Sequence, residues 1–441
     1  MLTWHGLNKM IKIPRHILIA GSSWIARFIS ATVQIFCIRY VIEAQGYSGY
    51  SVFALLSSLL AWAILFEFGI GNALQNYISE RIASRNEYYS YIWYLGRFSF
   101  IFALAMLAFV YPFSDNLSSW YLKSAEYLSA EYKSSLFYFT ISIFAFGAIG
   151  SIVYKIWYAE QKGWLANLVI AISSLLGLCF VYLCTITPEF NSLHFIIIAF
   201  FSPQAIISFG FFVFRFYNAK MNLVKNKVSI NAKPVFHRAF GFWGFAVIAT
   251  IVLQADAIVL SQKISASDIA LYFIMAKIFG MVGFIYSALL QAIWPVCTEL
   301  RVKKEWVKLK SLSNTYVAIG FFLVLFSGIA IYTFRSILFD VLSVGIDYDI
   351  SPWLFVLFTV YFILRVWSDM HAMLLQSINY IRPLWYIVPI QASICICVQW
   401  YMADYFGLYG IISGLIISFL CTTCIYLPYA YRKKLKEISY A

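Results

Sequence analysis

Apolar runs long enough to form membrane-spanning helices recur along almost the whole chain, with only short polar breaks between them. A helix needs ~20 predominantly apolar residues to cross the hydrocarbon core of a bilayer. We therefore predict membrane crossings at 16–42, 47–71, 92–113, 134–158, 164–187, 192–215, 240–262, 269–296, 313–334, 352–376, 383–403 and 407–430.

The runs are continuously apolar, whereas the strands of a membrane β-barrel alternate apolar and polar residues over short segments. The pattern predicts an all-α membrane protein with about 12 transmembrane helices. Only 12% of the 441 residues are charged, against ~25% in ordinary soluble domains, so lipid must cover most of the surface. The first run is too long, and too poorly followed by a cleavage site, to be a removed signal peptide.

Positive charge indicates the orientation, because loops rich in Lys and Arg are retained in the cytoplasm. With the N-terminus inside, the outer loops hold only four cations, Lys123, Lys133, Lys263 and Arg335. Both termini are then cytoplasmic, which requires an even number of crossings. The cytoplasmic loops hold most of the Lys and Arg residues and so explain the net charge of +13. No folded domain presents this charge to nucleic acid.

The longest basic break lies between the sixth and seventh runs and predicts two lobes. We expect an N-terminal six-helix lobe at 1–215, a basic cytoplasmic linker at 216–239 and a C-terminal six-helix lobe at 240–441. Six crossings are an even number, so the lobes share one orientation and would be related by a pseudo-twofold axis along the membrane normal. Segments 46–59 and 267–280 are a weak internal echo of this relation.

The connections are too short to fold into an extramembrane catalytic domain. The chain carries no P-loop, no HExxH motif and no nucleophile elbow. Its five histidines, His5, His16, His194, His237 and His371, lack metal-site spacing. Cys421 and Cys424 have no second pair nearby, so we interpret them as filler facing lipid. We predict that the protein is not an enzyme and needs no cofactor or metal.

Ionisable residues inside the runs are the informative ones, because a charge at the bilayer centre costs ~2.5–3.5 kcal/mol on insertion scales. Arg27 lies near the middle of the first run, and Ser23, Ser30 and Gln34 share its helical face. This stripe predicts the lining of a wet cavity. The alternative is an arginine paired with an acid that fixes helix packing.

In the run 352–376, Arg365, Asp369 and Gln376 also share one helical face. Because Arg365 and Asp369 are one turn apart, they can neutralise each other. A structural ion pair and a cavity-lining role are equally supported here.

Gln254 and Asp256 lie in the run 240–262, and Lys277 lies in the next run. At 1.5 Å rise per residue, Asp256 and Lys277 are at similar depth and could pair across neighbouring helices. Such a pair is either structural or a proton-sensitive latch that opens when Asp256 is neutral.

Glu67 lies towards the inner end of the run 47–71, and Arg97 is at comparable depth on the next helix. Gly69 and Gly71 remove side chains where helices pack closely or bend. A satisfied pair of Glu67 with Arg97 is the structural alternative to a coupling role for this acid.

Arg27, Lys277 and Arg365 together place three cations at membrane depth. In a bundle without a catalytic domain, they suggest an anionic ligand that enters from the membrane plane, such as a pyrophosphate-linked lipid. Aromatic residues make up 20% of the chain. They serve either as interfacial belts or as platforms for sugar rings, which sequence does not separate.

Several motifs carry a family resemblance. The segment 46–76 lies where the family has a Gly, Tyr-Gly, Trp and acid-x-Gly-x-Gly-Asn pattern. The last part begins here at Glu67, where family members usually carry Asp. DAIVLSQ (256–262) is followed by Tyr272, and QAIWPVCTEL (291–300), INYIRPLW (378–385) and GLYGIISG (407–414) complete the pattern. With them the chain resembles the O-antigen flippases (Wzx type), in the polysaccharide transporter family of the multidrug, oligosaccharidyl-lipid and polysaccharide flippase superfamily.

The resemblance implies two six-helix bundles around a V-shaped central cavity, which rock between inward-open and outward-open states in a bacterial inner membrane. It also implies an undecaprenyl-pyrophosphate-linked oligosaccharide as substrate. By position, Arg27, Glu67 and Lys277 match the charged cavity helices of such flippases, and Asp256 matches a recurrent acid of the seventh helix. From the charges themselves, we expect Arg27, Lys277 and Arg365 to bind the substrate, and Glu67, Asp256 and Asp369 to couple or gate. Expected partners are protons or sodium ions, the lipid bilayer and other polysaccharide assembly proteins.

Three other functions remain open from the sequence. A cation-coupled small-molecule exporter of the same superfamily would favour a more acidic cavity than these three cations provide. A membrane polysaccharide polymerase or acyltransferase would need acids and larger outer loops. A scaffold without transport activity is the fourth hypothesis.

Overall fold

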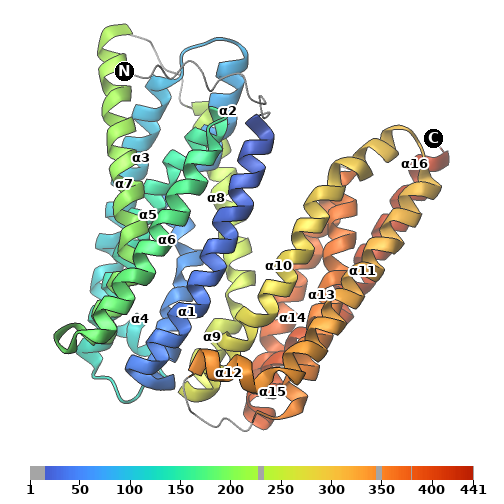
Figure 1. Ribbon diagram of the computed structural model, residues 1–441. Coiled ribbons are helices and arrows are strands. Elements are labelled where there is room, and N and C mark those ends of the chain that lie inside the picture. Colours follow the sequence, from blue (N-terminus) through green and yellow to red (C-terminus); the bar gives the residue numbers. More distant parts are fainter. Residues whose placement is uncertain (1–14, 227–232, 344–349, 379, 441) are drawn as a thin grey trace, which may run out of the picture. The chain divides into compact units, whose positions relative to one another are not determined.

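The computed structural model describes residues 15–226, 233–343, 350–378 and 380–440, and every regular element in these ranges is a helix (Figure 1). Ten of these helices are long and apolar enough to cross a membrane. The protein is therefore an all-helical membrane protein. Residues 227–232 of the predicted linker lie outside the described ranges.

The helices form two compact units. The first unit comprises Met1–Gln45, Leu56–Ser119 and Leu128–Val247, and the second comprises Gly46–Leu55, Trp120–Tyr127 and Ile248–Ala441. The chain therefore passes between the units twice within α1, once within α4, once between α4 and α5, and once within α8. The helices from the N-terminus to α8 are α1 (Arg15–Ser58), η2 (Leu59–Glu67), α2 (Ile70–Ala83), α3 (Tyr89–Val110), η3 (Tyr111–Phe113), α4 (Ser114–Tyr121), α5 (Ala130–Ala159), α6 (Gly163–Ile186), η4 (Pro188–Phe190), α7 (Leu193–Asn226) and α8 (Lys233–Leu253).

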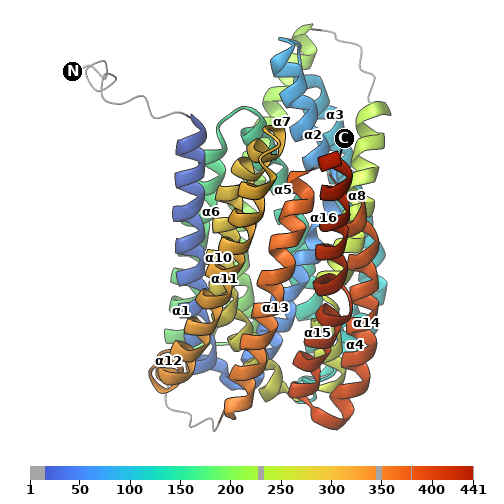
Figure 2. The same cartoon turned by 90° about the vertical axis from the view of Figure 1, so that its right-hand side faces the viewer.

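The remaining helices all belong to the second unit. They are α9 (Ala255–Lys263), α10 (Ala266–Val302), α11 (Trp306–Thr333), α12 (Arg335–Ser343), α13 (Pro352–Ser377), α14 (Arg382–Phe406), α15 (Leu408–Cys421) and α16 (Thr423–Tyr440). Figure 2 shows α16 running alongside α13 and α14, and both of these helices contact it.

The ten candidate spans differ from the twelve predicted segments at two places. The first two segments fall within one candidate range, Gly21–Glu67, although α1 consists of two helices that meet at a kink at Gly46, where the backbone is not helical (φ 67°, ψ −177°). The segment 240–262 is divided, since α8 ends at Leu253 and α9 begins at Ala255. The shared range reduces the count from twelve to eleven, and the divided segment 240–262, which is not among the candidates, reduces it to ten.

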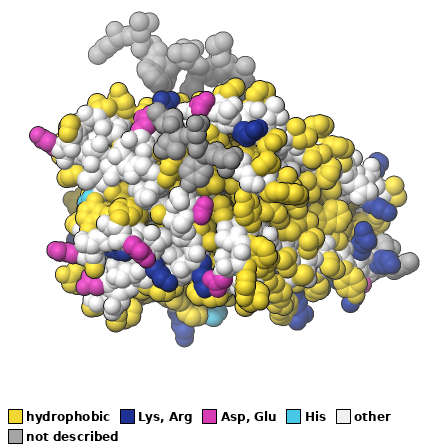
Figure 3. All heavy atoms as spheres, turned by 90° about the horizontal axis from the view of Figure 1, so that it is seen from below, with side chains coloured by type: hydrophobic (Ala, Val, Ile, Leu, Met, Phe, Trp, Pro, Cys, Tyr) yellow, Lys and Arg dark blue, Asp and Glu magenta, His cyan; other side chains and the backbone are white. Residues whose placement is uncertain are grey.

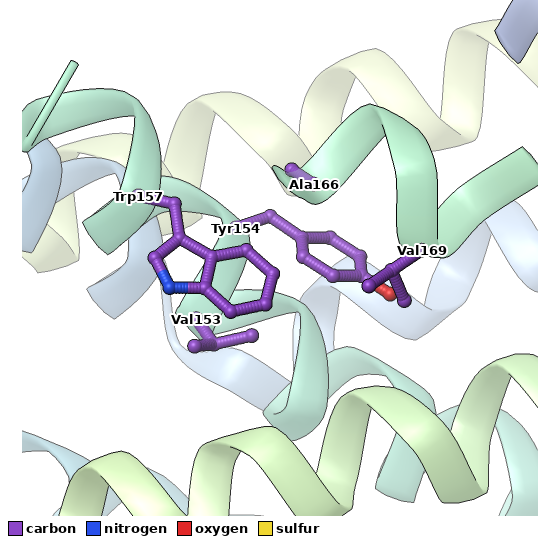
Figure 4. Close-up of a cluster of buried hydrophobic side chains, with 5 residues drawn as sticks. All are labelled: Val153, Tyr154, Trp157, Ala166 and Val169. Carbon is purple, nitrogen blue, oxygen red and sulfur yellow. The ribbon is translucent and has the colours of Figure 1, made fainter. Parts of the chain in front are cut away.

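Apolar side chains hold α5 and α6 together in the first unit. Val153, Tyr154 and Trp157 of α5 pack against Ala166 and Val169 of α6 (Figure 4). Two aromatic rings with small residues opposite fill the space between the helices at the density that protein interiors require. This contact makes α5 a rigid support for the polar residues that it carries.

Two tryptophan indoles stabilise the backbone where helices are irregular. In the first unit, Phe68 and Gly69 both have positive φ (54° and 66°), and Trp243 Nε1 donates to Leu65 O at 3.0 Å just before this break. In the second unit, Pro428 lacks the N–H that Cys424 O would accept in a helix, and Trp367 Nε1 donates to that oxygen at 3.0 Å. At Cys424 the indole thus satisfies a carbonyl that the helix cannot pair in an apolar environment, and at Leu65 it adds to the bond from the Phe68 backbone N–H at 3.4 Å.

Large apolar side chains are exposed along the described helices, among them Phe28, Phe214 and Phe326. Figure 3 shows hydrophobic side chains over broad parts of the face that it presents. Soluble monomers rarely expose continuous apolar patches of this kind, and a bilayer is the environment that this surface fits.

Candidate functional site

A small cavity in the first unit contains the predicted acid Glu67. The cavity measures about 230 Å³ and is bordered by η2, α5 and α7, with Glu67, Ser151, Lys155 and Gln204 as its polar lining. Glu67 is only 3% exposed. Within the described part of the chain, its Oε2 atom accepts no hydrogen bond.

The cation beside Glu67 is Lys155, with which it interacts electrostatically. The predicted alternative partner Arg97 is instead exposed on α3. Lys155 lies on α5, one helical turn before its end, within the predicted segment 134–158, but it was not among the predicted site residues. Lys155 is part of the helix because α5 continues to Ala159.

Gly71 leaves the space that the Glu67 carboxylate occupies. A Cβ atom at this position would lie 2.8 Å from Glu67 Oε2 and 3.2 Å from Lys155 Cγ. Ser99 Oγ of α3 donates to the Glu67 backbone oxygen at 3.4 Å. The glycine and serine therefore fix where the carboxylate meets the cavity, which confirms that Gly71 serves close packing.

The predicted polar stripe on α1 lies partly against α6. Arg27 is exposed, while Ser23, Ser30 and Gln34 are half-buried. Ser30 Oγ is 3.1 Å from Ser174 Oγ of α6, so this end of the stripe contacts a neighbouring helix.

Arg27 also lies near a polar chain that the sequence did not reveal. It interacts electrostatically with Tyr158 of α5. The Tyr158 hydroxyl donates to Asn167 Oδ1 at 2.8 Å, and Asn167 Nδ2 donates to Ser22 Oγ at 2.9 Å. Asn167 is buried on α6, and a buried amide inside an apolar run was the available signal.

In the second unit, Asp256 is held by hydrogen bonds instead of by the predicted partner Lys277. Tyr272 OH of α10 donates to Asp256 Oδ2 at 2.5 Å, and the Ala257 backbone N–H donates to Oδ1 at 2.9 Å. Asp256 also interacts electrostatically with Arg365. Lys277 lies on α10 five residues beyond Tyr272 and is exposed.

Gln254 is the residue between α8 and α9, so Asp256 lies in the first turn of a new helix. The N-terminus of a helix carries the positive end of its dipole, which favours the carboxylate. A discontinuous helix of this kind, with an acid at the break, is a frequent element of ion and substrate sites in transporters.

Arg365 and Asp369 do form a pair on α13, with 3.6 Å between Nε and Oδ2. Both side chains are 46% exposed, so the surrounding helices do not enclose the pair. The long separation and the exposure leave Arg365 able to bind another anion. Gln376 is half-buried near the end of the same helix.

Gln399 is a buried polar residue that the sequence reading did not single out. It is fully buried on α14 and its Nε2 donates to Ile411 O of α15 at 3.0 Å. Gly410 and Gly414 lie against α14, since a Cβ at Gly414 would be 2.5 Å from Gln399 Cγ. The G-x-x-x-G spacing in GLYGIISG was the signal for this close contact.

At one end of the first unit, Glu160 joins three helices. Its carboxylate accepts from Tyr88 OH at 2.9 Å and from Arg215 of α7. Burial, and then the Glu160 carboxylate, raise the pKa of Tyr88, so its hydroxyl stays a donor. No group of three His, Cys, Asp or Glu residues that could hold a metal ion occurs in the described ranges.

Curated relatives align with this chain over nearly its whole length. It is 41% identical over 432 residues to a protein of Salmonella typhi described as "Putative O-antigen transporter", covering 98% of this chain and 99% of the relative. A protein of Yersinia pseudotuberculosis described as "Putative O-antigen export protein" is 34% identical, with 97% and 98% covered. No family model matches the chain.

Solved structures share the fold at low sequence identity. An inward-facing multidrug resistance MATE family transporter of the MOP superfamily has a TM-score of 0.75 at 14% identity, covering 95% of this chain and 99% of the other. The lipid II flippase MurJ in an inward closed conformation has a TM-score of 0.67 at 14% identity, with 96% and 90% covered. The fold is therefore that of MATE transporters and MurJ.

Proposed function

Because the chain belongs to the O-antigen transporter family within the multidrug, oligosaccharidyl-lipid and polysaccharide flippase superfamily, we propose that it translocates undecaprenyl-pyrophosphate-linked oligosaccharide units. The proposed direction of transport is from the cytoplasmic to the periplasmic leaflet of a bacterial inner membrane. The protein is a transporter and not an enzyme.

The observation that carries this proposal is the exposure of cations within spanning helices. Arg27 and Lys277 are both exposed inside helices long enough to cross the bilayer, and Arg365 is half-exposed. A cation at that depth is costly unless it faces water or an anionic partner. A pyrophosphate offers two such anionic groups, while the prenyl tail can stay in lipid.

Transport would proceed by alternating access of two helical lobes, 1–215 and 240–441, with about 12 crossings and both termini cytoplasmic. A polar head group needs a hydrated path, and the ligand shifts the protein between states only by binding one state better. Protonation or sodium binding at Glu67, Asp256 or Asp369 would couple this change to an ion gradient. Glu67 has the strongest support, because its carboxylate borders a cavity and has an oxygen without a donor in the described chain.

The direct test is complementation of a deletion strain. Arg27→Ala and Lys277→Ala are expected to reduce surface-polysaccharide display at least tenfold, with unchanged protein level in the membrane. Lys123→Ala, an exposed cation in the connection after α4, is the matched control and should leave display unchanged. If both Arg27→Ala and Lys277→Ala support full display, the substrate-binding assignment is wrong.

A cation-coupled small-molecule exporter is the competing function in this superfamily. It predicts that resistance to cationic compounds, and not polysaccharide display, is lost in the deletion strain. Measuring both phenotypes in one strain separates the two functions.

A further inference from the structure

The first unit carries a second, larger hollow that the transport proposal does not use. It lies between α3 and the N-terminal half of α8 and has a volume of about 700 Å³, within the ~300–1,000 Å³ range of small-molecule sites. We call it the α3–α8 hollow and define it by Phe68, Phe98, Phe236, Phe240, Lys233 and His237. Figure 2 shows this part of α8 near α2 and α3, and Arg238 pairs with Glu80 of α2.

Aromatic rings form its wall. The Phe68 ring is 5.3 Å from Phe98 and 6.2 Å from Phe240, and Phe98 is 4.8 Å from Phe236, between ring centroids. Phe240 is nevertheless 58% exposed. Rings that pack with each other and still present open faces form a surface on which an apolar chain can lie.

Positive charge borders the hollow at the end where α8 begins. Lys233 and His237 are one helical turn apart, so their side chains lie on the same face. Both are exposed, and neither has an ion-pair or hydrogen-bond partner in the described ranges. The neighbouring Arg238, by contrast, is 2.7 Å from Glu80. The positive end of the α8 dipole adds to the same potential.

We infer that the α3–α8 hollow binds one anionic phospholipid of the surrounding leaflet, with an acyl chain against the aromatic wall and the phosphate at Lys233 and His237. The aromatic wall has no polar side chain that could form a hydrogen bond with a sugar. An acyl chain needs no hydrogen-bond partner. Basic groups at the end of a lipid-accessible groove recognise anionic head groups. The inference is independent of the transported substrate.

Binding at this place would also act on the helix break beside Glu67. Phe68 has φ 54°, a conformation that side-chain-bearing residues rarely adopt, and its ring is 5.4 Å from Trp243 and 4.9 Å from Phe102. An acyl chain packed on Phe68 adds contacts that only this conformation makes. The lipid would therefore stabilise the junction between η2 and α2.

The test is native mass spectrometry of the full-length protein released from nanodiscs of phosphatidylglycerol and phosphatidylcholine in equal amounts. We expect one phosphatidylglycerol to be retained in preference. Lys233→Gln should weaken its retention about fivefold, the effect of one cation near an anionic surface, and Lys233→Gln with His237→Gln should abolish the preference. Lys220→Gln, which removes a cation that lies over Trp93 outside the hollow, is the matched control and should retain it.

Location is tested separately by a photo-crosslinking phenylalanine analogue at Phe240, which should yield a phosphatidylglycerol adduct. The inference is overturned if the double variant keeps the preference, if phosphatidylcholine is retained equally by the wild type, or if the adduct contains no phospholipid. Displacement of phosphatidylglycerol by undecaprenyl phosphate at equal concentration would identify the hollow as a polyprenyl site and would also overturn it.

Discussion

Glu67 in the first unit and Asp256 in the second are both predicted coupling acids, but their surroundings differ. Asp256 accepts hydrogen bonds from Tyr272 and from the Ala257 backbone. Glu67 has an oxygen without a donor in the described ranges, beside Lys155 and a cavity of about 230 Å³. A buried carboxylate without donors is stabilised least by its surroundings, so Glu67 is the better candidate for a group that changes its charge during transport.

The comparison also concerns the backbone. Glu67 ends a 3₁₀ helix and precedes two residues with positive φ, whereas Asp256 begins a regular helix whose dipole favours it. Mid-helix 3₁₀ segments often mark hinges. The first unit thus combines an unsatisfied acid with an irregular backbone, and the second combines a satisfied acid with a regular helix start.

The largest expected effect is that of Gly69→Ala, which breaks the junction next to Glu67. A Cβ atom there would be 2.4 Å from Ala239 O and 2.8 Å from Trp243 N, at φ 66°. Strained backbone and overpacking together should destabilise the protein by at least about 3 kcal/mol, measured as loss of folded protein in detergent by size-exclusion chromatography.

The control for this variant is Gly210→Ala in α7, where a Cβ atom would meet nothing within 4 Å. It should raise stability slightly, because alanine favours a helix more than glycine does. Equal yields of the two variants would show that the junction is not rigid.

The next largest effect is expected on transport for Glu67→Gln. The amide fits the cavity but carries no titratable charge, so the dependence of transport on an ion gradient should be lost. A coupling free energy of ~1–3 kcal/mol corresponds to a 5- to 150-fold change. Asp256→Asn should change the gradient dependence less, measured in the same vesicles with and without a gradient. A larger effect for Asp256→Asn would reverse our assignment of the two acids.

Tyr272→Phe removes the side-chain donor to Asp256 and leaves the carboxylate and the bond from the Ala257 backbone in place. Hydrogen bonds to charged groups contribute ~1.5–3 kcal/mol, so the thermal midpoint in detergent should fall measurably. Tyr401→Phe, an exposed tyrosine on α14, is the control. An unchanged midpoint for Tyr272→Phe would mean that Asp256 does not depend on this bond.

Arg365→Gln should have the smallest effect on stability, because its pair with Asp369 is long (3.6 Å) and half-exposed. If Arg365 binds substrate, polysaccharide display will fall while the thermal midpoint stays the same. A lower midpoint with normal display would instead show that the pair is structural.

The sequence predicted the helices well, because long apolar runs leave a chain in lipid little choice. It identified Glu67, Asp256 and Arg365 as costly residues, since any charge stands out in an apolar run. Their partners were harder: the predicted pairs of Glu67 with Arg97 and Asp256 with Lys277 assumed equal depth, whereas Lys155 and Tyr272 are the observed neighbours. Depth along an axis does not determine which way a side chain points.

The sequence did not predict the helix break at Phe68 either. Gly69 allowed a bend, but the sequence carried no sign of the positive φ of Phe68 or of the hydrogen bond that Trp243 of α8 donates to Leu65 O beside it. The orphaned oxygen of Cys424 was in principle predictable from Pro428, although its partner Trp367 was not. Local signals therefore locate irregularities, and tertiary contacts decide how they are satisfied.

The central claim is that the protein moves a lipid-linked oligosaccharide between leaflets. Its most direct measurement uses purified protein in sealed vesicles that contain the labelled lipid-linked oligosaccharide, and follows how much becomes accessible to a membrane-impermeant glycosidase on the opposite side. Wild-type protein should increase the accessible fraction with time. A double variant with Arg27→Ala and Lys277→Ala should reduce the rate of this increase at least tenfold. Folded wild-type protein that is no faster than protein-free vesicles, with an ion gradient applied in either direction, would contradict the account.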